Sequence, residues 1–184
     1  CNIPGIYFEN KELTKKDKKS LKWAIENNIK IISQSFVENK RDIDHIRKYI
    51  CEINGDLKSI KLLSKIETNL GVDNFKEIIR YSDGIIIARG DLIPECGLIN
   101  SVDKEFDLLL KVKKYEKEKE VIIATHILDN MRKGIIPNIN ELESIYTFVN
   151  LGVTGFLLAS ETSIGNYPVK SVEMLKMLIN LYKK

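Results

Sequence analysis

Several features that would place this chain in a specialised class of protein are scarce or missing. It has three cysteines, at positions 1, 51 and 96, and no Cys-x-x-Cys pair. An odd number of cysteines without that spacing argues against a disulfide framework or a structural zinc site, and it fits a reducing compartment. The two histidines, His45 and His126, lie far apart in the sequence and do not suggest a metal-binding pair.

The chain also lacks an excess of charge of one sign, and it has no long apolar run. The net charge is +3 over 184 residues, of which 43% are apolar and 30% charged. This length allows one domain with a sizeable core, and the balanced charge gives no sign of a nucleic-acid or anionic-membrane partner. No apolar run approaches the roughly 20 residues that span a bilayer. Because the chain begins with Cys and not Met, we expect a fragment, and any targeting peptide upstream is invisible.

Five short apolar runs alternate with longer segments of helical period. The runs cover residues 29–33, 60–66, 84–88, 121–125 and 154–159. Strands that are apolar throughout are buried on both faces, and strands that alternate with helices form a parallel sheet. Two architectures fit this pattern: an open doubly wound sheet, or part of a (β/α)8 barrel, which takes about 250 residues when complete. No G-x-G-x-x-G follows the first run, so the dinucleotide-binding version of the open sheet loses its main support.

Polar residues follow nearly every one of these strands. The strand endings read SQSF (33–36), SKIET (64–68), ARGD (88–91), ATH (124–126) and ASET (159–162). In parallel α/β folds the carboxyl ends of the strands meet at one edge, and active sites lie there. We therefore predict a shared site built from strand-end residues: Lys65, Glu67, Arg89, Asp91, Thr125 and Glu161.

The residue types at this edge suit a phosphorylated or carboxylated ligand held on a divalent metal. Lys65 and Glu67 are two apart on a strand, so both face one side, the interior of a barrel. Glu67 and Asp91 supply two carboxylates, which suit Mg²⁺ because that ion keeps waters and takes further oxygens from its substrate. Lys65 is a point charge suited to a phosphoryl oxygen, and Thr125 offers a hydroxyl.

A structural explanation of the same residues stays open. Lys65 and Glu67 can form a plain ion pair that closes the end of the barrel, and Arg89 and Asp91 can form another. Gly90, between the latter two, lets its backbone approach a ligand closely.

At these residues the chain resembles pyruvate kinase. The resemblance begins with NIPG at 2–5 and continues through four longer segments. These are IKLLSKIETNLGVDNFKEII (60–79), YSDGIIIARGDL (81–92), VIIATHILDNM (121–131) and ETSIGNYPVKSVEML (161–175). The family has SKIE, ARGDL, ATQMLESM and GETAKGDYP motifs in this order. A weaker resemblance is to the aldolases that bind pyruvate and phosphoenolpyruvate on a similar barrel, which lack counterparts of the last two motifs.

The resemblance implies a partial TIM (β/α)8 barrel, made of parallel strands 4–8 with their helices. Residues 1–184 would then be the C-terminal portion of the catalytic barrel domain, without the lid and regulatory domains. The implied activity is that of a glycolytic phosphotransferase, which converts phosphoenolpyruvate and ADP to pyruvate and ATP with Mg²⁺ (or Mn²⁺) and K⁺. The K⁺ ligands are expected outside this chain. The family also implies a homotetramer at full length and a cytoplasmic location, although an organellar form would look the same here.

The resemblance gives each site residue a role. It implies that Lys65 is catalytic and binds the substrate by stabilising the transferring phosphate, and that Glu67 and Asp91 are the metal ligands. The backbone N–H groups of Gly90 and Asp91, with the Thr125 hydroxyl, would bind the substrate carboxylate. Thr125 would also lie near C3 of the enolate, on a path for proton delivery.

The chain also departs from the family pattern. His126 replaces a glutamine, Ile93 replaces a glycine, and ASET replaces the family's SGET at 159–162. Segment 137–148 loses an arginine and an aspartate that the family has near its subunit interface. The changes at 137–148 and 159–162 favour one alternative, a non-catalytic pyruvate-kinase-like paralogue. The alternative among enzymes is a metal-dependent aldolase or lyase acting on pyruvate or phosphoenolpyruvate. The fragment by itself is expected to be inactive.

Overall fold

The structure, a computed structural model, describes residues 12–183, so the NIPG segment at 2–5 and Cys1 lie outside the described residues. Five strands alternate with helices along the chain. The strands are β1 (Ile31–Gln34), β2 (Lys61–Ile66), β3 (Gly84–Ala88), β4 (Glu120–Ala124) and β5 (Gly155–Leu157). The α-helices are α1 (Lys15–Glu26), α2 (Lys40–Glu52), α3 (Asn69–Asp73), α4 (Phe75–Tyr81), α5 (Arg89–Cys96), α6 (Leu98–Tyr115), α7 (Ile139–Asn150), α8 (Ser160–Ser163) and α9 (Pro168–Tyr182). Two 3-10 helices are η1 (Leu57–Ser59) and η2 (Asp129–Arg132).

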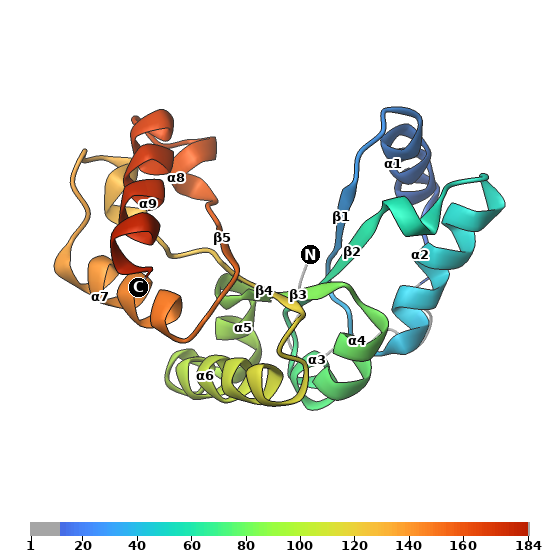
Figure 1. The fold of residues 1–184 in the computed structure, drawn as a ribbon, viewed down its shortest axis with the longest axis horizontal. Coiled ribbons are helices and arrows are strands. Elements are labelled where there is room, and N and C mark those ends of the chain that lie inside the picture. Colours follow the sequence, from blue (N-terminus) through green and yellow to red (C-terminus); the bar gives the residue numbers. More distant parts are fainter. Residues whose placement is uncertain (1–11, 184) are drawn as a thin grey trace.

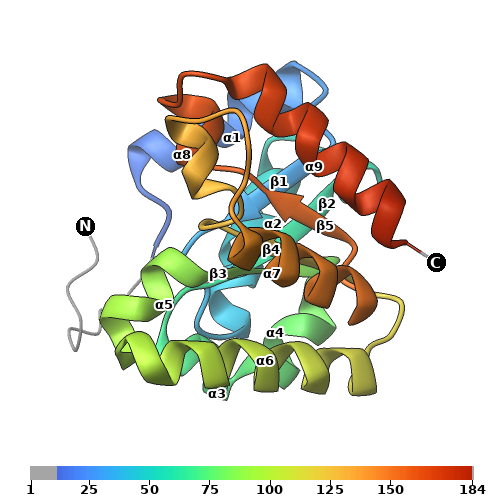
Figure 2. The same ribbon diagram turned by 90° about the vertical axis from the view of Figure 1, so that its left-hand side faces the viewer.

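The five strands form one parallel sheet in sequence order, β1-β2-β3-β4-β5. Figure 1 shows that the sheet curls into an open trough, with the helices around its outer side. Figure 2 shows the same arrangement from the side, with α6 running along the outside of the trough beneath β3 and β4. The predicted α/β fold, a partial (β/α)8 barrel of five parallel strands, is therefore confirmed.

Alternation along the strands divides the apolar side chains between two faces. The main core lies between the sheet and the helices, where Ile85, Ile87 and Ile123 are fully buried. A smaller cluster on the inner face of the trough comprises Leu63, Ile86, Ala88 and Ala124. Successive side chains point to opposite faces of a strand, so Lys65, two residues after Leu63, also faces the inside.

Side-chain caps begin three of the helices. Thr14, Asn39 and Asn138 each accept a hydrogen bond from a backbone N–H in the first turn of α1, α2 and α7. In each case the third helical residue is acidic and bonds back to the cap, which completes a capping box. These local signals start the helices after the loops that follow the strands.

The predicted boundaries need three corrections. The last strand covers only residues 155–157 of the predicted 154–159, and β4 ends at Ala124, so Thr125 lies just beyond it. The segment of helical period after β3 forms two helices, α5 and α6, and not one. The break comes at Gly97, whose φ of 81° is readily adopted only by glycine.

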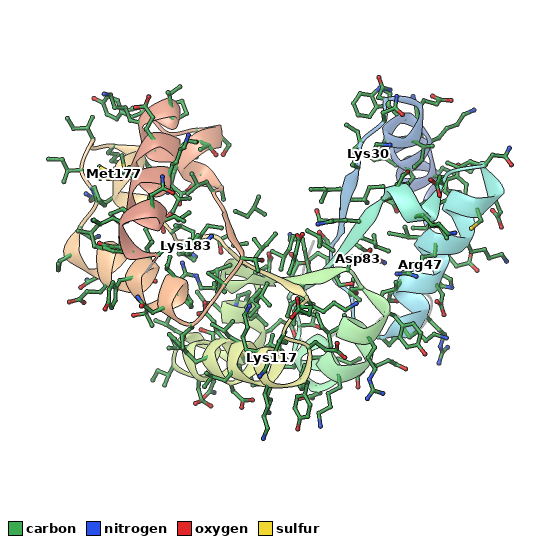
Figure 3. The ribbon with its side chains drawn as sticks, viewed as in Figure 1. Lys30, Arg47, Asp83, Lys117, Met177 and Lys183 are labelled. Carbon is green, nitrogen blue, oxygen red and sulfur yellow. The ribbon has the colours of Figure 1, made fainter. Side chains whose placement is uncertain are left out.

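The sheet has two edges within the described part of the chain, β1 and β5, each of which pairs with one neighbour only. Unpaired edges expose backbone donors and acceptors and are usually covered by further chain. Lys30, Asp83 and Lys117, labelled in Figure 3, come shortly before β1, β3 and β4 respectively. No helix among residues 12–183 combines the length and apolarity needed to cross a membrane.

Candidate active site at the carboxyl ends of the strands

The predicted site residues follow three neighbouring strands of the sheet. Lys65 is the next-to-last residue of β2, and Glu67 is the first residue after that strand. Gly90 follows β3, and Thr125 follows β4. The register aligns Lys65 with Ile86 and Ala88 with Ala124, so the strands end nearly level. All of these residues therefore lie at the carboxyl-terminal end of the trough.

Lys65 and Glu67 are in direct contact. The Lys65 Nζ lies 2.5 Å from Glu67 Oε1, while the backbone N–H of Phe36 donates to Glu67 Oε2 at 2.6 Å. The Glu67 side chain is buried, with 1% of its surface exposed, whereas 21% of the Lys65 side chain remains exposed. Lys65 Nζ also lies 3.4 Å from the Ser35 hydroxyl, from the loop after β1. The carboxylate thus holds a partly accessible ammonium group at the inner face.

Gly90 and Thr125 meet across the ends of β3 and β4. The Gly90 N–H donates to Thr125 Oγ1 at 2.8 Å, and the Thr125 hydroxyl donates to the Ala124 carbonyl at 2.6 Å. A Cβ at position 90 would lie 3.2 Å from Thr125 Oγ1 and 3.7 Å from His126 Nε2. Glycine is therefore suited to this position because a side chain would crowd Thr125; the predicted close approach of its backbone to a ligand stays a prediction.

Asp91 stands in the first turn of α5 and is partly buried. No hydrogen bond or ion pair of its carboxylate occurs within residues 12–183, and the predicted alternative of an Arg89–Asp91 ion pair is absent there. A carboxylate near a helix N-terminus is stabilised by the helix dipole. Asp91 is accordingly the acidic group of the site whose oxygens are uncommitted.

Arg89 is directed away from the inner face. Its Nε and Nη2 donate to the Thr125 carbonyl at 3.1 and 2.7 Å, and Nη2 also donates to the His126 carbonyl at 2.5 Å. Its Nε lies 3.7 Å from Glu105 Oε1, and its guanidinium lies over the Phe148 ring. Burial lowers the pKa of the Arg89 guanidinium, although the negative charges of neighbouring carboxylates oppose this.

Glu105, on α6, is a residue that the sequence analysis missed. Its side chain is almost fully buried, and desolvation raises the pKa of its carboxyl to about 7 even though the positive charges of Arg89 and His126 favour the ionised form. The available signal was its spacing: Glu105 shares the buried stripe of the helix with Ser101, Leu108 and Leu109. A glutamate on an apolar helix face requires a partner.

Glu161 does not belong to this group, contrary to the expectation from its position. It is fully buried, and its two oxygens accept hydrogen bonds from the backbone N–H groups of Leu128 and Ala159. It ties η2 to the end of β5.

His126 lies near Gly90, and its Nδ1 is 2.6 Å from Asp129 Oδ2.

The acidic residues suit a metal that needs few protein ligands. No group of three or more His, Cys, Asp or Glu side chains among residues 12–183 could enclose a metal ion. Glu67 and Asp91 follow adjacent strands, and Mg²⁺ is commonly held by one or two carboxylates, with water and substrate oxygens completing its shell. The donor set therefore fits Mg²⁺ and does not fit an ion that needs a complete protein cage.

The family model for "Pyruvate kinase, barrel domain" matches residues 1–172. The chain belongs to the pyruvate kinase family. Curated pyruvate kinases agree with this assignment. The enzyme of Methanocaldococcus jannaschii is 35% identical over 174 residues, which cover 95% of this chain and 38% of the relative. That of Encephalitozoon cuniculi is 32% identical over 177 residues, covering 96% of this chain and 40% of the relative. A pyruvate kinase named as a cytosolic isozyme, from Solanum tuberosum, is 35% identical over 181 residues, covering 96% and 34%.

The chain thus spans well under half the length of the pyruvate kinases that it matches. The alignment covers nearly all of this chain, so the described half-barrel is the part of a pyruvate kinase barrel that these relatives share with it.

Proposed function

We propose that this chain supplies strands 4–8 of a pyruvate kinase catalytic barrel, in which the phosphoryl group of phosphoenolpyruvate passes to ADP. One observation carries the proposal. The Lys65 ammonium is held 2.5 Å from the buried Glu67 carboxylate, at the same end of the sheet as Gly90 and Thr125. The names of the relatives support the reaction, and the contact supports the placement of the charge that the reaction needs.

Lys65 is the residue that we assign to the transferring phosphate. Phosphoryl transfer requires little covalent chemistry from a protein; it requires in-line positioning and neutralisation of the charge on the phosphate oxygens. An ammonium that is partly exposed on the inner face can contact such an oxygen, and Glu67 keeps it from swinging into solvent. Because the Glu67 side chain is buried and also accepts the Phe36 N–H, its own position is restrained.

Glu67 and Asp91 are the residues that would hold Mg²⁺ or Mn²⁺. When bound, the ion would neutralise substrate oxygens and help to orient them. Glu67 Oε1 is shared with Lys65, so Glu67 ties the phosphate-binding cation to the metal ligands. The Asp91 carboxylate makes no competing hydrogen bond or ion pair among residues 12–183. We assign the K⁺ ligands to parts of the protein outside this chain.

Gly90, Asp91 and Thr125 are the residues that we assign to the substrate carboxylate. The Gly90 N–H now donates to Thr125 Oγ1 at 2.8 Å, and the Thr125 hydroxyl donates to the Ala124 carbonyl at 2.6 Å. A carboxylate that binds here would accept from both groups in place of these two bonds. We assign the Asp91 N–H as a further donor, because it lies in the first turn of α5, where backbone N–H groups have no acceptor within the helix. Thr125 is also the residue that we place on the proton path to C3 of the enolate.

The remaining parts of the proposal concern the complete protein. The pyruvate kinases that this chain matches are about two and a half to three times its length, since it covers 31–40% of them. We propose that the missing strands and lid contribute the nucleotide and K⁺ sites, that the complete protein is a homo-oligomer, a tetramer as in the family, and that it acts in the cytoplasm.

A coupled assay on the full-length protein with Mg²⁺ and K⁺ tests the proposal. Formation of ATP from phosphoenolpyruvate and ADP is the expected result. Carbon–carbon bond cleavage or formation with pyruvate, without ATP, would replace the proposal by an aldolase or lyase activity. A folded protein with neither activity would identify a non-catalytic paralogue.

A further inference from the structure

The turn that carries Thr125 has a backbone that needs support. Thr125 and His126 have φ values of 65° and 52°, in the left-handed region. This region is uncommon for residues other than glycine, and a β-branched residue such as threonine is a clear outlier there. Two successive residues in it persist only where the surrounding structure holds them. The conformation matters because it presents the Thr125 hydroxyl to the Gly90 N–H.

Arg89 supplies that support. Three of its N–H···O contacts reach the Thr125 and His126 carbonyls, at 3.1, 2.7 and 2.5 Å, so that one guanidinium spans the whole turn. Arg89 is adjacent to Gly90, which is the donor to Thr125 Oγ1. The same two-residue segment, Arg89–Gly90, therefore binds the turn through both its backbone carbonyls and its hydroxyl.

Glu105 in turn faces the guanidinium of Arg89. Its Oε1 lies 3.7 Å from Arg89 Nε and accepts no hydrogen bond from any residue in the described range. A buried carboxylate oxygen without a hydrogen-bond partner is costly, so its presence requires a reason. The only guanidinium beside it in the described residues is the one that holds the turn.

We propose that Arg89 and Glu105 are positioning residues, which hold the Thr125–His126 turn in the conformation that brings the Thr125 hydroxyl to Gly90. They act through Thr125 and touch no substrate. The positioning stands on the geometry alone, and only its effect on catalysis rests on the proposed function.

The charges around the pair make the proposal measurable. Glu105 faces Arg89 and lies within the electrostatic influence of His126, and both favour its ionised form; burial opposes them, and its pKa is raised to about 7. The negative charges of Asp129 and Glu161 also act on Arg89. Protonation of Glu105 near neutral pH removes one of the charges that orient the guanidinium, so the turn should respond to that protonation.

The test is an NMR titration of this chain between pH 5 and 9. The backbone amide signals of Gly90, Thr125 and His126 should shift with a midpoint near 7, the same as that of the Glu105 carboxyl carbon. In Glu105→Gln these signals should stop responding at that midpoint. Asp103→Asn, which removes an exposed carboxylate from the same helix, is the matched control and should keep it. The titration is repeated in His126→Gln, which removes the neighbouring imidazole; a midpoint should persist there and move somewhat upward, because the charge of His126 favours ionised Glu105.

If the amide signals of the turn keep their midpoint near pH 7 in Glu105→Gln, the positioning role is overturned. Signals that lose their midpoint in His126→Gln would overturn the part played by Glu105. Each outcome is read from the folded chain and does not depend on any enzymatic activity.

The catalytic consequence has a separate readout in the full-length protein. Arg89→Lys provides a single point charge that cannot span both carbonyls. It should raise KM for phosphoenolpyruvate about tenfold, the effect of roughly one lost hydrogen bond, with a smaller change in kcat. An unchanged KM beside a disrupted turn would overturn the catalytic effect. A wild-type protein that forms no ATP would instead contradict the proposed function and leave the NMR result standing.

Discussion

The substitution Glu105→Gln is expected to stabilise the protein above neutral pH. The carboxyl of Glu105 has a pKa of about 7 in the folded chain against an ordinary value of 4.5. Between these two pH values the folded state binds the proton more readily than the unfolded state, so the free energy of unfolding falls as pH rises and levels off above 7. Glutamine keeps the shape of the protonated side chain without ionising.

The size of the effect follows from the gap between the two pKa values. Each pH unit of that gap corresponds to about 1.4 kcal/mol, so the ionised carboxylate costs up to about 3 kcal/mol at pH 8. The attraction of Arg89 is already included, because it is one of the causes that set the pKa. The variant should therefore match the native protein below about pH 4.5 and exceed its free energy of unfolding by up to about 3 kcal/mol at pH 8.

Urea denaturation followed by circular dichroism at several pH values measures this difference. Urea is preferred to guanidinium chloride because it does not screen the Arg89–Glu105 interaction. Asp103→Asn on the same helix should change stability little at any pH, since surface substitutions of this kind are usually worth no more than about 0.5 kcal/mol. A Glu105→Gln variant whose advantage does not grow between pH 5 and 8 would refute the reasoning.

Three further predictions follow from single contacts. Glu161→Ala should lower the free energy of unfolding by about 2–4 kcal/mol, because two buried backbone N–H groups lose their acceptor; an unchanged urea midpoint would contradict this. Gly90→Ala puts a Cβ 3.2 Å from Thr125 Oγ1, so hydrogen exchange at the residue 90 amide should accelerate, and unaltered protection would argue against that packing. Cys51 is exposed, whereas burial raises the pKa of the Cys96 thiol; partial iodoacetamide labelling read by mass spectrometry should therefore modify Cys51 first, and equal rates would count against the assigned burial.

The sheet could be predicted from sequence because its signal is local. Runs such as GIIIA at 84–88 are apolar at every position, and each residue of that strand is indeed buried. The contact between Lys65 and Glu67 was also predictable, since residues two apart on a strand face one side, and Glu67 continues that spacing just past the end of β2.

The functions of the other charged residues depended on distant partners. Glu161 and Glu67 both follow a strand, but both oxygens of Glu161 accept backbone N–H groups, whereas one oxygen of Glu67 contacts the Lys65 ammonium. The sequence contains no sign of that difference. Arg89 could have formed an ion pair with Asp91, two residues further along the chain. In the structure its ion pair is with Glu105, on the next helix. Such choices are settled by the packing of α5 and α6 against the sheet, which local patterns do not encode.

The central claim is that the Lys65 ammonium performs the phosphoryl-transfer role at the carboxyl end of the trough. The most direct test compares Lys65→Met with Lys61→Met in the full-length protein, by ATP formation from phosphoenolpyruvate and ADP. Lys61 lies on the same strand but at its amino end, where it pairs with Glu120, so it is a matched control. The account predicts that Lys65→Met abolishes ATP formation with the fold retained by circular dichroism, and that Lys61→Met preserves it. Turnover in Lys65→Met equal to that of the native protein would contradict the account.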